Sequence, residues 1–133
     1  MKKEKTVKLN THLKIDNSLN GNILKLEKDY AKVELKTIDS MRADEEGLVH
    51  GGFIFGAADF TAMASVNDPF VVLAKSETKF LAPVKVGQSV LFEGTITNSD
   101  GRKQSVEVSG MVGEVKVFTG IFYTVILSNH VLS

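Results

Sequence analysis

The spacing of apolar residues changes twice along this chain. Residues 22–37, NILKLEKDYAKVELKT, alternate between apolar and polar on both sides of Lys28 and Asp29. This period of two predicts two antiparallel strands joined by a tight turn. Residues 52–66 are apolar in the continuous manner of a helix and contain no proline, and Asn67, Asp68 and Pro69 predict where that helix ends. We therefore expect a β-hairpin followed by one long helix.

After Phe70 the chain returns to strand-like patterns. Runs rich in β-branched and aromatic residues cover residues 71–82, 89–97, 103–112 and 115–127, with a predicted turn at residues 98–101. Pro83 and Gly87 indicate a kink or a turn between the first two of these runs. Together with the hairpin, these runs predict an α+β domain with five or six mostly antiparallel strands and one long helix.

The predicted helix has no polar face, whereas a helix on a protein surface keeps one. Its apolar residues point in nearly every direction around the axis: Phe53, Ile54, Phe55, Ala57, Ala58, Phe60, Ala62, Met63, Ala64 and Val66. We expect a curved antiparallel sheet to wrap around it. Gly52, Gly56, Asp59 and Met63 share one stripe, whose small residues would admit a second backbone, so we also expect a homodimer.

Length and composition restrict the remaining possibilities. The 133 residues suit one compact domain, which we divide into an N-terminal extension, residues 1–19, and a folded domain, residues 20–133. Sixteen basic and sixteen acidic residues cancel, so we expect neither a nucleic acid nor a membrane as partner. The absence of cysteine excludes disulfides and thiolate metal sites. No apolar segment has the length of a signal peptide or a membrane span, so we expect a soluble, cytoplasmic protein.

Candidate chemistry lies around the start of the predicted helix, in GLVHGGFIFGAADFTA, residues 47–62. Asp59 is either a hydrogen-bonded structural carboxylate or a functional base or nucleophile, because an unpaired buried carboxylate is costly. His50-Gly51-Gly52 is either a simple turn into the helix or a site where free N–H groups meet a ligand oxygen, favoured by the helix dipole. The two functional interpretations together describe an oxyanion hole and a base.

These features resemble the hotdog-fold acyl-CoA thioesterases, in particular the phenylacetate-pathway type. The resemblance rests on the strand hairpin, the HGG motif at residues 50–52, an aspartate seven residues after the second glycine, and the following strands, including FLAPVKVGQSVLFEGTI. It covers residues 20–128 of the chain. The resemblance implies a hotdog fold, in which the sheet wraps the helix, a dimer with a continuous sheet, and a thioester site at the dimer interface.

The resemblance also implies roles for individual residues. The N–H of Gly51, in the motif with His50 and Gly52, would polarise the thioester carbonyl, and Asp59 would act as general base on water or as nucleophile. Seven or eight residues of helix rise roughly 10 to 12 Å, so Asp59 should serve the site of the partner chain. Coenzyme A would enter as a thioester substrate, with no other cofactor. We expect no metal, since His12, His50 and His130 lack ligand spacing.

Ligand contacts beyond the motif are less constrained by the sequence. The phosphates of coenzyme A would require basic side chains, for which Lys79 and Lys85 are selected from a wider set that includes Lys75, Arg102 and Lys103. The acyl chain would lie against Phe53, with Phe55 and Phe60 as further candidates. Each of these residues also has an ordinary interpretation, as a solvated lysine or a core aromatic.

Two positions depart from the family pattern and support a second hypothesis. Asp44 stands six residues before His50, where many relatives carry asparagine, and a negative charge there would hinder an oxyanion. Leu73 stands where some relatives carry a serine or threonine that orients water. The alternative function is a regulatory protein that binds an acyl thioester without hydrolysing it. The sequence leaves open the acyl length, the carrier (coenzyme A or acyl-carrier protein), and the choice between a homodimer and a homotetramer.

Overall fold

The computed structural model describes residues 7–133, so residues 1–6 of the expected N-terminal extension lie outside the described part. The helices are α1 (Asn17–Asn20), the 3-10 helix η1 (Asp39–Met41) and α2 (Gly51–Val66). The strands are β1 (Asn22–Glu27), β2 (Tyr30–Lys36), β3 (Val71–Phe80), β4 (Ser89–Asp100), β5 (Lys103–Val112) and β6 (Val115–Ile126). The hairpin, the long helix and the four later strands are confirmed, whereas the two short helices were not predicted. Among residues 7–133, no helix is long and apolar enough to span a membrane.

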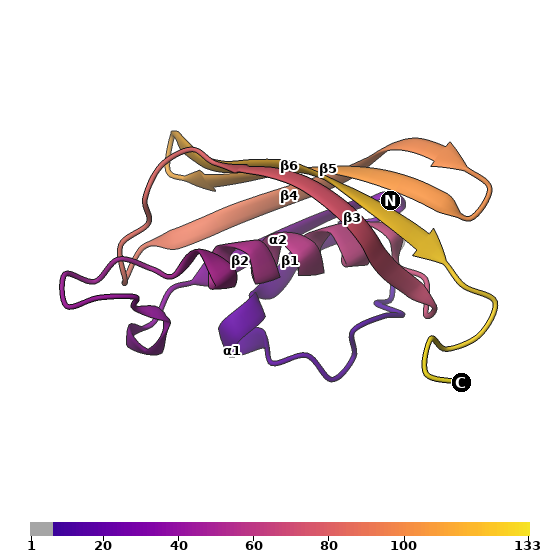
Figure 1. The fold of residues 1–133 in the computed structure, drawn as a ribbon, viewed down its shortest axis with the longest axis horizontal. Coiled ribbons are helices and arrows are strands. Elements are labelled where there is room, and N and C mark those ends of the chain that lie inside the picture. Colours follow the sequence, from indigo (N-terminus) through magenta and orange to yellow (C-terminus); the bar gives the residue numbers. More distant parts are fainter. Residues whose placement is uncertain (1–6) are drawn as a thin grey trace, which may run out of the picture.

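All six strands form one antiparallel sheet in the order β1-β2-β4-β5-β6-β3. The chain leaves β2, forms α2, and then places β3 at the far edge of the sheet beside β6. Figure 1 shows the sheet lying across one side of α2, with β3 passing close to the helix. The result is a strongly curved sheet wrapped around one helix, as the hotdog resemblance implies.

Alternation along the strands and small residues on α2 explain this packing. In β2, Ala31, Val33 and Leu35 are fully buried. On the facing side of α2, the Thr61 hydroxyl donates to the Ala57 carbonyl at 2.7 Å and is thereby satisfied inside the core. A Cβ atom on Gly94 of β4 would lie 2.6 Å from the Ser65 hydroxyl oxygen, so α2 approaches this strand more closely than any side chain would allow.

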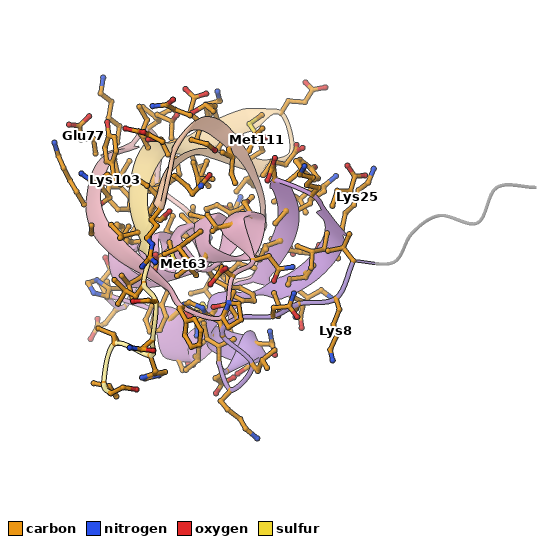
Figure 2. All side chains as sticks on the ribbon, turned by 90° about the vertical axis from the view of Figure 1, so that its right-hand side faces the viewer. Lys8, Lys25, Met63, Glu77, Lys103 and Met111 are labelled. Atoms are coloured by element: carbon orange, nitrogen blue, oxygen red, sulfur yellow. The ribbon has the colours of Figure 1, made fainter. Side chains whose placement is uncertain are left out.

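The opposite side of α2 is covered by the N-terminal segment of the same chain. A Cβ atom on Gly56 would lie 3.2 Å from Oδ1 of Asn20 in α1, and Met63 is only 1% exposed. Asn67, at the end of α2, holds the segment by accepting from the Asn10 N–H and donating to the Lys8 carbonyl. Figure 2 shows the sheet arching around the helix in this view. The expectation that a second chain must cover the stripe is therefore wrong for Met63, which its own chain already buries, whereas Gly56 stays partly exposed.

One irregularity decides which side chains of β3 face the helix. The pairing of β3 with β6 shifts between Leu73 and Lys75, so Ala74 is an extra residue in the strand. Before this bulge, Val71 and Leu73 face the core. After it the inward positions are even-numbered, because Phe80 packs on Phe118 with ring centroids 5.4 Å apart.

Candidate functional site

The start of α2 leaves hydrogen-bond donors free. His50 is the N-cap residue with an extended backbone, and its side chain makes no capping hydrogen bond. The His50 N–H donates to the Met41 carbonyl at 2.8 Å, and the Phe53 N–H donates to the His50 carbonyl at 3.1 Å. Within residues 7–133, no backbone carbonyl accepts from the N–H of Gly51 or Gly52. These two donors lie at the positive end of the helix dipole, where an anionic oxygen is stabilised.

The two glycines have different neighbours. A Cβ atom on Gly52 would lie 3.0 Å from Nε2 of His50, so the imidazole ring of His50 lies against Gly52. The same ring meets Phe53 edge to face at 6.1 Å, and Phe53 packs against the core. A Cβ atom on Gly51 would lie 3.5 Å from the Phe80 ring, which is an ordinary contact distance. His50, Gly51, Gly52 and Phe53 thus lie together at the start of α2, and the structure adds Phe80 to them.

A groove opens beside these residues. It has a volume of about 370 Å³ and lies between the start of α2 and the segment that follows β3; it is lined by Leu48, Val49, Gly51, Ile54, Phe80, Leu81, Ala82, Pro83, Val84 and Val117. A second cavity of about 540 Å³ shares Leu48, Pro83 and Val84 with it, so the two are adjacent. Sequence reasoning assigned no role to Leu48, Phe80 or Leu81. The only signal was their apolar character in segments that also carry family motifs.

Asp59 is a partly buried carboxyl in the second half of α2. Its Oδ1 atom is buried and has no hydrogen-bond partner in the part of the chain that the structure describes. Burial raises the pKa of Asp59 from 3.8 to about 6. Asp59 follows Phe55 by one helical turn, and the Phe55 ring packs against Phe122 of β6 at 5.6 Å. Asp59 therefore faces the β6–β3 side of the sheet.

One chain does not bring Asp59 to its own Gly51. Asp59 comes eight positions after Gly51, which corresponds to roughly 12 Å along the helix axis. Within one chain, the free donors lie at the start of α2, and the carboxyl without a hydrogen-bond partner among residues 7–133 lies in its second half. A complete site would require a second copy.

The predicted ligand-binding lysines lie on different faces. Lys85 lines the second cavity, next to the groove. Thr78 points inward, since its Cγ2 atom lies 2.8 Å from where a Cβ atom on the buried Gly120 would be. Side chains alternate between the two faces of a strand, so Lys79 points away from α2. Lys79 lines a separate hollow on the outer sheet face, together with Glu77 and Glu107. The structure therefore does not bring Lys79 to the groove of its own chain.

The two positions that depart from the family pattern have clear surroundings. Asp44 lines the second cavity, and its Oδ1 accepts from the Glu46 N–H at 3.0 Å and the Leu48 N–H at 3.1 Å. One carboxylate oxygen is thus occupied in holding the loop before α2. Leu73 packs against the core beside the β3 bulge.

Phe60, a further candidate for contact with the acyl chain, is fully buried in the core. Residues 7–133 contain no cluster of three or more histidine, aspartate or glutamate side chains arranged to hold a metal.

Comparison with known proteins identifies the family. The sequence profile of the Thioesterase superfamily matches residues 46–118, which include the HGG motif and α2. The chain is 50% identical to the methylthioribose-1-phosphate isomerase of Aquifex aeolicus over 119 residues, covering 90% of this chain and 26% of the isomerase. It is 32% identical to the transcription factor FapR of Oceanobacillus iheyensis over 112 residues, covering 83% of this chain and 59% of FapR. The chain thus spans only part of both relatives.

Solved structures agree on the fold. The uncharacterized protein PH1136 of Pyrococcus horikoshii superposes with a TM-score of 0.96 at 45% identity, covering 98% of this chain and 100% of PH1136. Two streptococcal proteins share the fold at lower identity. A hypothetical thioesterase of Streptococcus pneumoniae with coenzyme A has a TM-score of 0.75 at 19% identity, covering 84% of this chain and 88% of that protein. The protein smu.793 of Streptococcus mutans, bound to acetyl-CoA, has a TM-score of 0.76 at 22% identity, covering 90% of this chain and 99% of smu.793. With a profile match over more than half of its length and this architecture, the chain belongs to the Thioesterase superfamily and has the hotdog fold.

Proposed function

We propose that this protein is an acyl-CoA thioesterase whose active site joins the start of α2 in one chain to Asp59 of a second copy. The observation that carries the proposal is the Asp59 carboxyl, which has a buried, unpartnered oxygen and a pKa raised by burial to about 6. A carboxyl of this kind adds nothing to the stability of the fold. A raised pKa is, however, the property that a general base needs. Membership of the Thioesterase superfamily supports the reaction class. The two streptococcal proteins of the same fold support coenzyme A as the carrier.

The chemistry needs only groups that the chain itself provides. The N–H groups of Gly51 and Gly52 would donate to the thioester oxygen and stabilise the negative charge that develops as water attacks the carbonyl carbon. Asp59 would take the proton from that water, and the C–S bond would then break to release a carboxylic acid and the coenzyme A thiol. A carboxyl with a pKa of about 6 is ionised at neutral pH and is a stronger base than an ordinary aspartate.

The site requires a homodimer. β3 is an edge strand, and Asp59 faces the β6–β3 side of the sheet. A twofold axis beside β3 would set two α2 helices antiparallel and bring Gly51 of each chain towards Asp59 of the other. We expect sedimentation of the pure protein at micromolar concentration to give a homodimer or a homotetramer. A monomer at that concentration would contradict the two-chain site.

A second function is favoured by one specific observation. The likeness to the transcription factor FapR covers 83% of this chain, so a domain of this kind can form part of a regulator. In this alternative the chain binds an acyl thioester without hydrolysing it. The bound thioester then changes how the chain contacts a protein partner. The Asp44 carboxylate in the second cavity is compatible with slow or absent turnover, since negative charge opposes a nearby oxyanion.

One experiment separates the two functions. The pure protein is incubated with a panel of acyl-CoAs while free thiol is followed, and binding is measured separately by calorimetry. Multiple turnovers that are lost in Asp59→Asn support the thioesterase. Saturable binding without thiol release supports the regulatory alternative. Neither release nor binding with any member of the panel would contradict both.

A further inference from the structure

The groove beside Gly51 differs chemically from the cavity next to it. Its lining contains no charged side chain and, apart from the backbone at Gly51, offers a ligand mainly hydrocarbon. The adjoining cavity is lined by the polar residues Asp44, Glu46, Lys85 and Gln88, together with Gly47 and the shared Leu48, Pro83 and Val84. Gly51, which carries one of the free N–H donors, belongs to the apolar groove. A carbonyl bound at this N–H would therefore have an apolar space on one side and a polar one within reach.

This difference separates the two arms of a thioester. The coenzyme A arm carries amide groups, which are costly to bury where they find no hydrogen-bond partner. The cavity offers such partners on its side chains, whereas every side chain that lines the groove is apolar. A hydrocarbon acyl chain has the opposite requirement, since it gains free energy by leaving water. The acyl chain therefore fits the groove, and the coenzyme A arm fits the polar side.

Phe80 forms the outer wall of the groove. In the single chain this residue is 55% exposed, although its ring is held edge to face against the buried Phe118 at 5.4 Å. The ring lies 3.5 Å from the position of a Gly51 Cβ, so it stands directly beside the helix start. Leu48 and Leu81, 41% and 49% exposed, extend this apolar surface. The groove volume of about 370 Å³ is near the lower end of the range for small-molecule sites, about 300 to 1,000 Å³, which limits the size of the occupant.

We propose that the groove between Gly51 and Phe80 is a subsite for short, uncharged hydrocarbon acyl groups, and that Phe80 is the residue that sets the chain-length preference. The inference rests on the proposed function, because it names the substrate class of the same site. It adds two properties that the reaction class does not imply: selection against acyl groups with a terminal carboxylate, and dependence of chain-length preference on one aromatic ring.

The first experiment compares the wild type, Phe80→Ala and Phe80→Leu on straight-chain acyl-CoAs from acetyl to octanoyl. For the wild type, kcat/KM should rise about fourfold for each methylene buried, until the groove is filled. Phe80→Ala should lower kcat/KM for hexanoyl-CoA by roughly tenfold and for acetyl-CoA by less than about threefold, since the shortest chain does not reach the ring. Phe80→Leu should lie between the two.

Phe70→Ala is the matched control. Phe70 is also a partly exposed phenylalanine, and it lies next to the opposite end of β3 from Phe80. Its substitution should leave the chain-length profile unchanged. Equal profiles for the wild type and Phe80→Ala would overturn the role of Phe80, and a change of the same size in Phe70→Ala would show a general effect on the sheet instead.

The second experiment tests charge selection with acyl groups of equal carbon number. Butyryl-CoA should exceed succinyl-CoA in kcat/KM by at least about tenfold, because no charged side chain lines the groove to pair with a buried carboxylate. Equal or higher activity on succinyl-CoA would refute the uncharged-acyl assignment even if the protein is a thioesterase.

Binding measurements keep this inference distinct from the proposed function. If the wild type releases no thiol, dissociation constants of the same acyl-CoAs should still follow the predicted dependence on chain length, charge and Phe80. The dissociation constant of free coenzyme A should be the same in the wild type and Phe80→Ala. Weaker binding of free coenzyme A to Phe80→Ala would show that the groove holds the coenzyme A arm, and binding of no acyl-CoA would refute the subsite together with the function.

Discussion

Asp59→Asn should make the protein more stable at neutral pH while removing its activity. Burial raises the pKa of the Asp59 carboxyl from 3.8 to about 6, and one pKa unit corresponds to about 1.4 kcal/mol, so ionised Asp59 costs about 3 kcal/mol of folding free energy at pH 7.5. An asparagine avoids the charge but leaves a buried amide without a partner, which costs about 1 to 2 kcal/mol. The net expected gain in stability is about 1 to 2 kcal/mol.

The pH dependence has a definite sign. The folded-state pKa of Asp59 is raised, so below about pH 3 the carboxyl is neutral in both the folded and the unfolded chain and imposes no cost. As pH rises from about 3 to about 6, the unfolded chain ionises first and becomes relatively more stable. The wild type should therefore lose stability relative to Asp59→Asn across this interval, by about 2 kcal/mol between pH 4.5 and 7.5.

Urea unfolding of both proteins at pH 4.5 and 7.5, at one fixed protein concentration, measures this difference directly. All other carboxylates are present in both proteins, so their contributions cancel when the two free energies of unfolding are subtracted. The same Asp59→Asn preparation should hydrolyse acyl-CoAs about 10² to 10⁴ times more slowly, the usual contribution of a positioned base, with acyl-CoA binding retained.

Two results would refute this reasoning. If Asp59→Asn is less stable than the wild type at pH 7.5, the carboxylate makes a stabilising interaction in the assembled protein and is not an unpartnered base. If the variant is folded and hydrolyses acyl-CoAs at the wild-type rate, the base lies elsewhere. A gain in stability combined with a loss of turnover is the expected mark of a residue retained for function.

Three further predictions concern the site and the core. The wild-type kcat/KM should fall about tenfold between pH 7 and pH 5, because protonated Asp59 cannot accept a proton, and a flat profile in still-folded protein would exclude this base. Gly51→Ala should keep the wild-type melting temperature, since its Cβ meets Phe80 at 3.5 Å, yet lose at least about tenfold in kcat/KM by narrowing the oxyanion position; full activity would contradict the site. Gly94→Ala should lower the melting temperature by several degrees, since the added Cβ would overpack the core at a cost of about 1 to 3 kcal/mol. This Cβ would lie 2.6 Å from the Ser65 hydroxyl oxygen and 3.3 Å from the Thr61 carbonyl oxygen. Calorimetry that shows no shift would mean that α2 moves away freely.

Local patterns in the sequence were sufficient to predict the six strands and the long helix, but not the short helices α1 and η1. The period of two at residues 22–37 and the continuous apolar run of α2 are properties of neighbouring residues, so the hairpin and the helix were predicted almost to their ends. The HGG motif and Asp59 were identified in the same way, as residue types at a fixed spacing along one helix. That spacing also showed that one chain cannot bring Gly51 and Asp59 together, because the rise of a helix is constant.

The surroundings of these residues were decided only by the tertiary structure. Unbroken alternation from the buried Val71 would turn Lys79 towards the helix and Phe80 away from it. The extra residue at Ala74 reverses this, so Lys79 lies on the outer face and Phe80 forms the wall beside Gly51. The raised pKa of Asp59 and its unpartnered oxygen likewise depend on which distant segments cover the helix. Bulges, strand order and burial arise from pairing between segments far apart in the chain, and local periodicity carries no information about them.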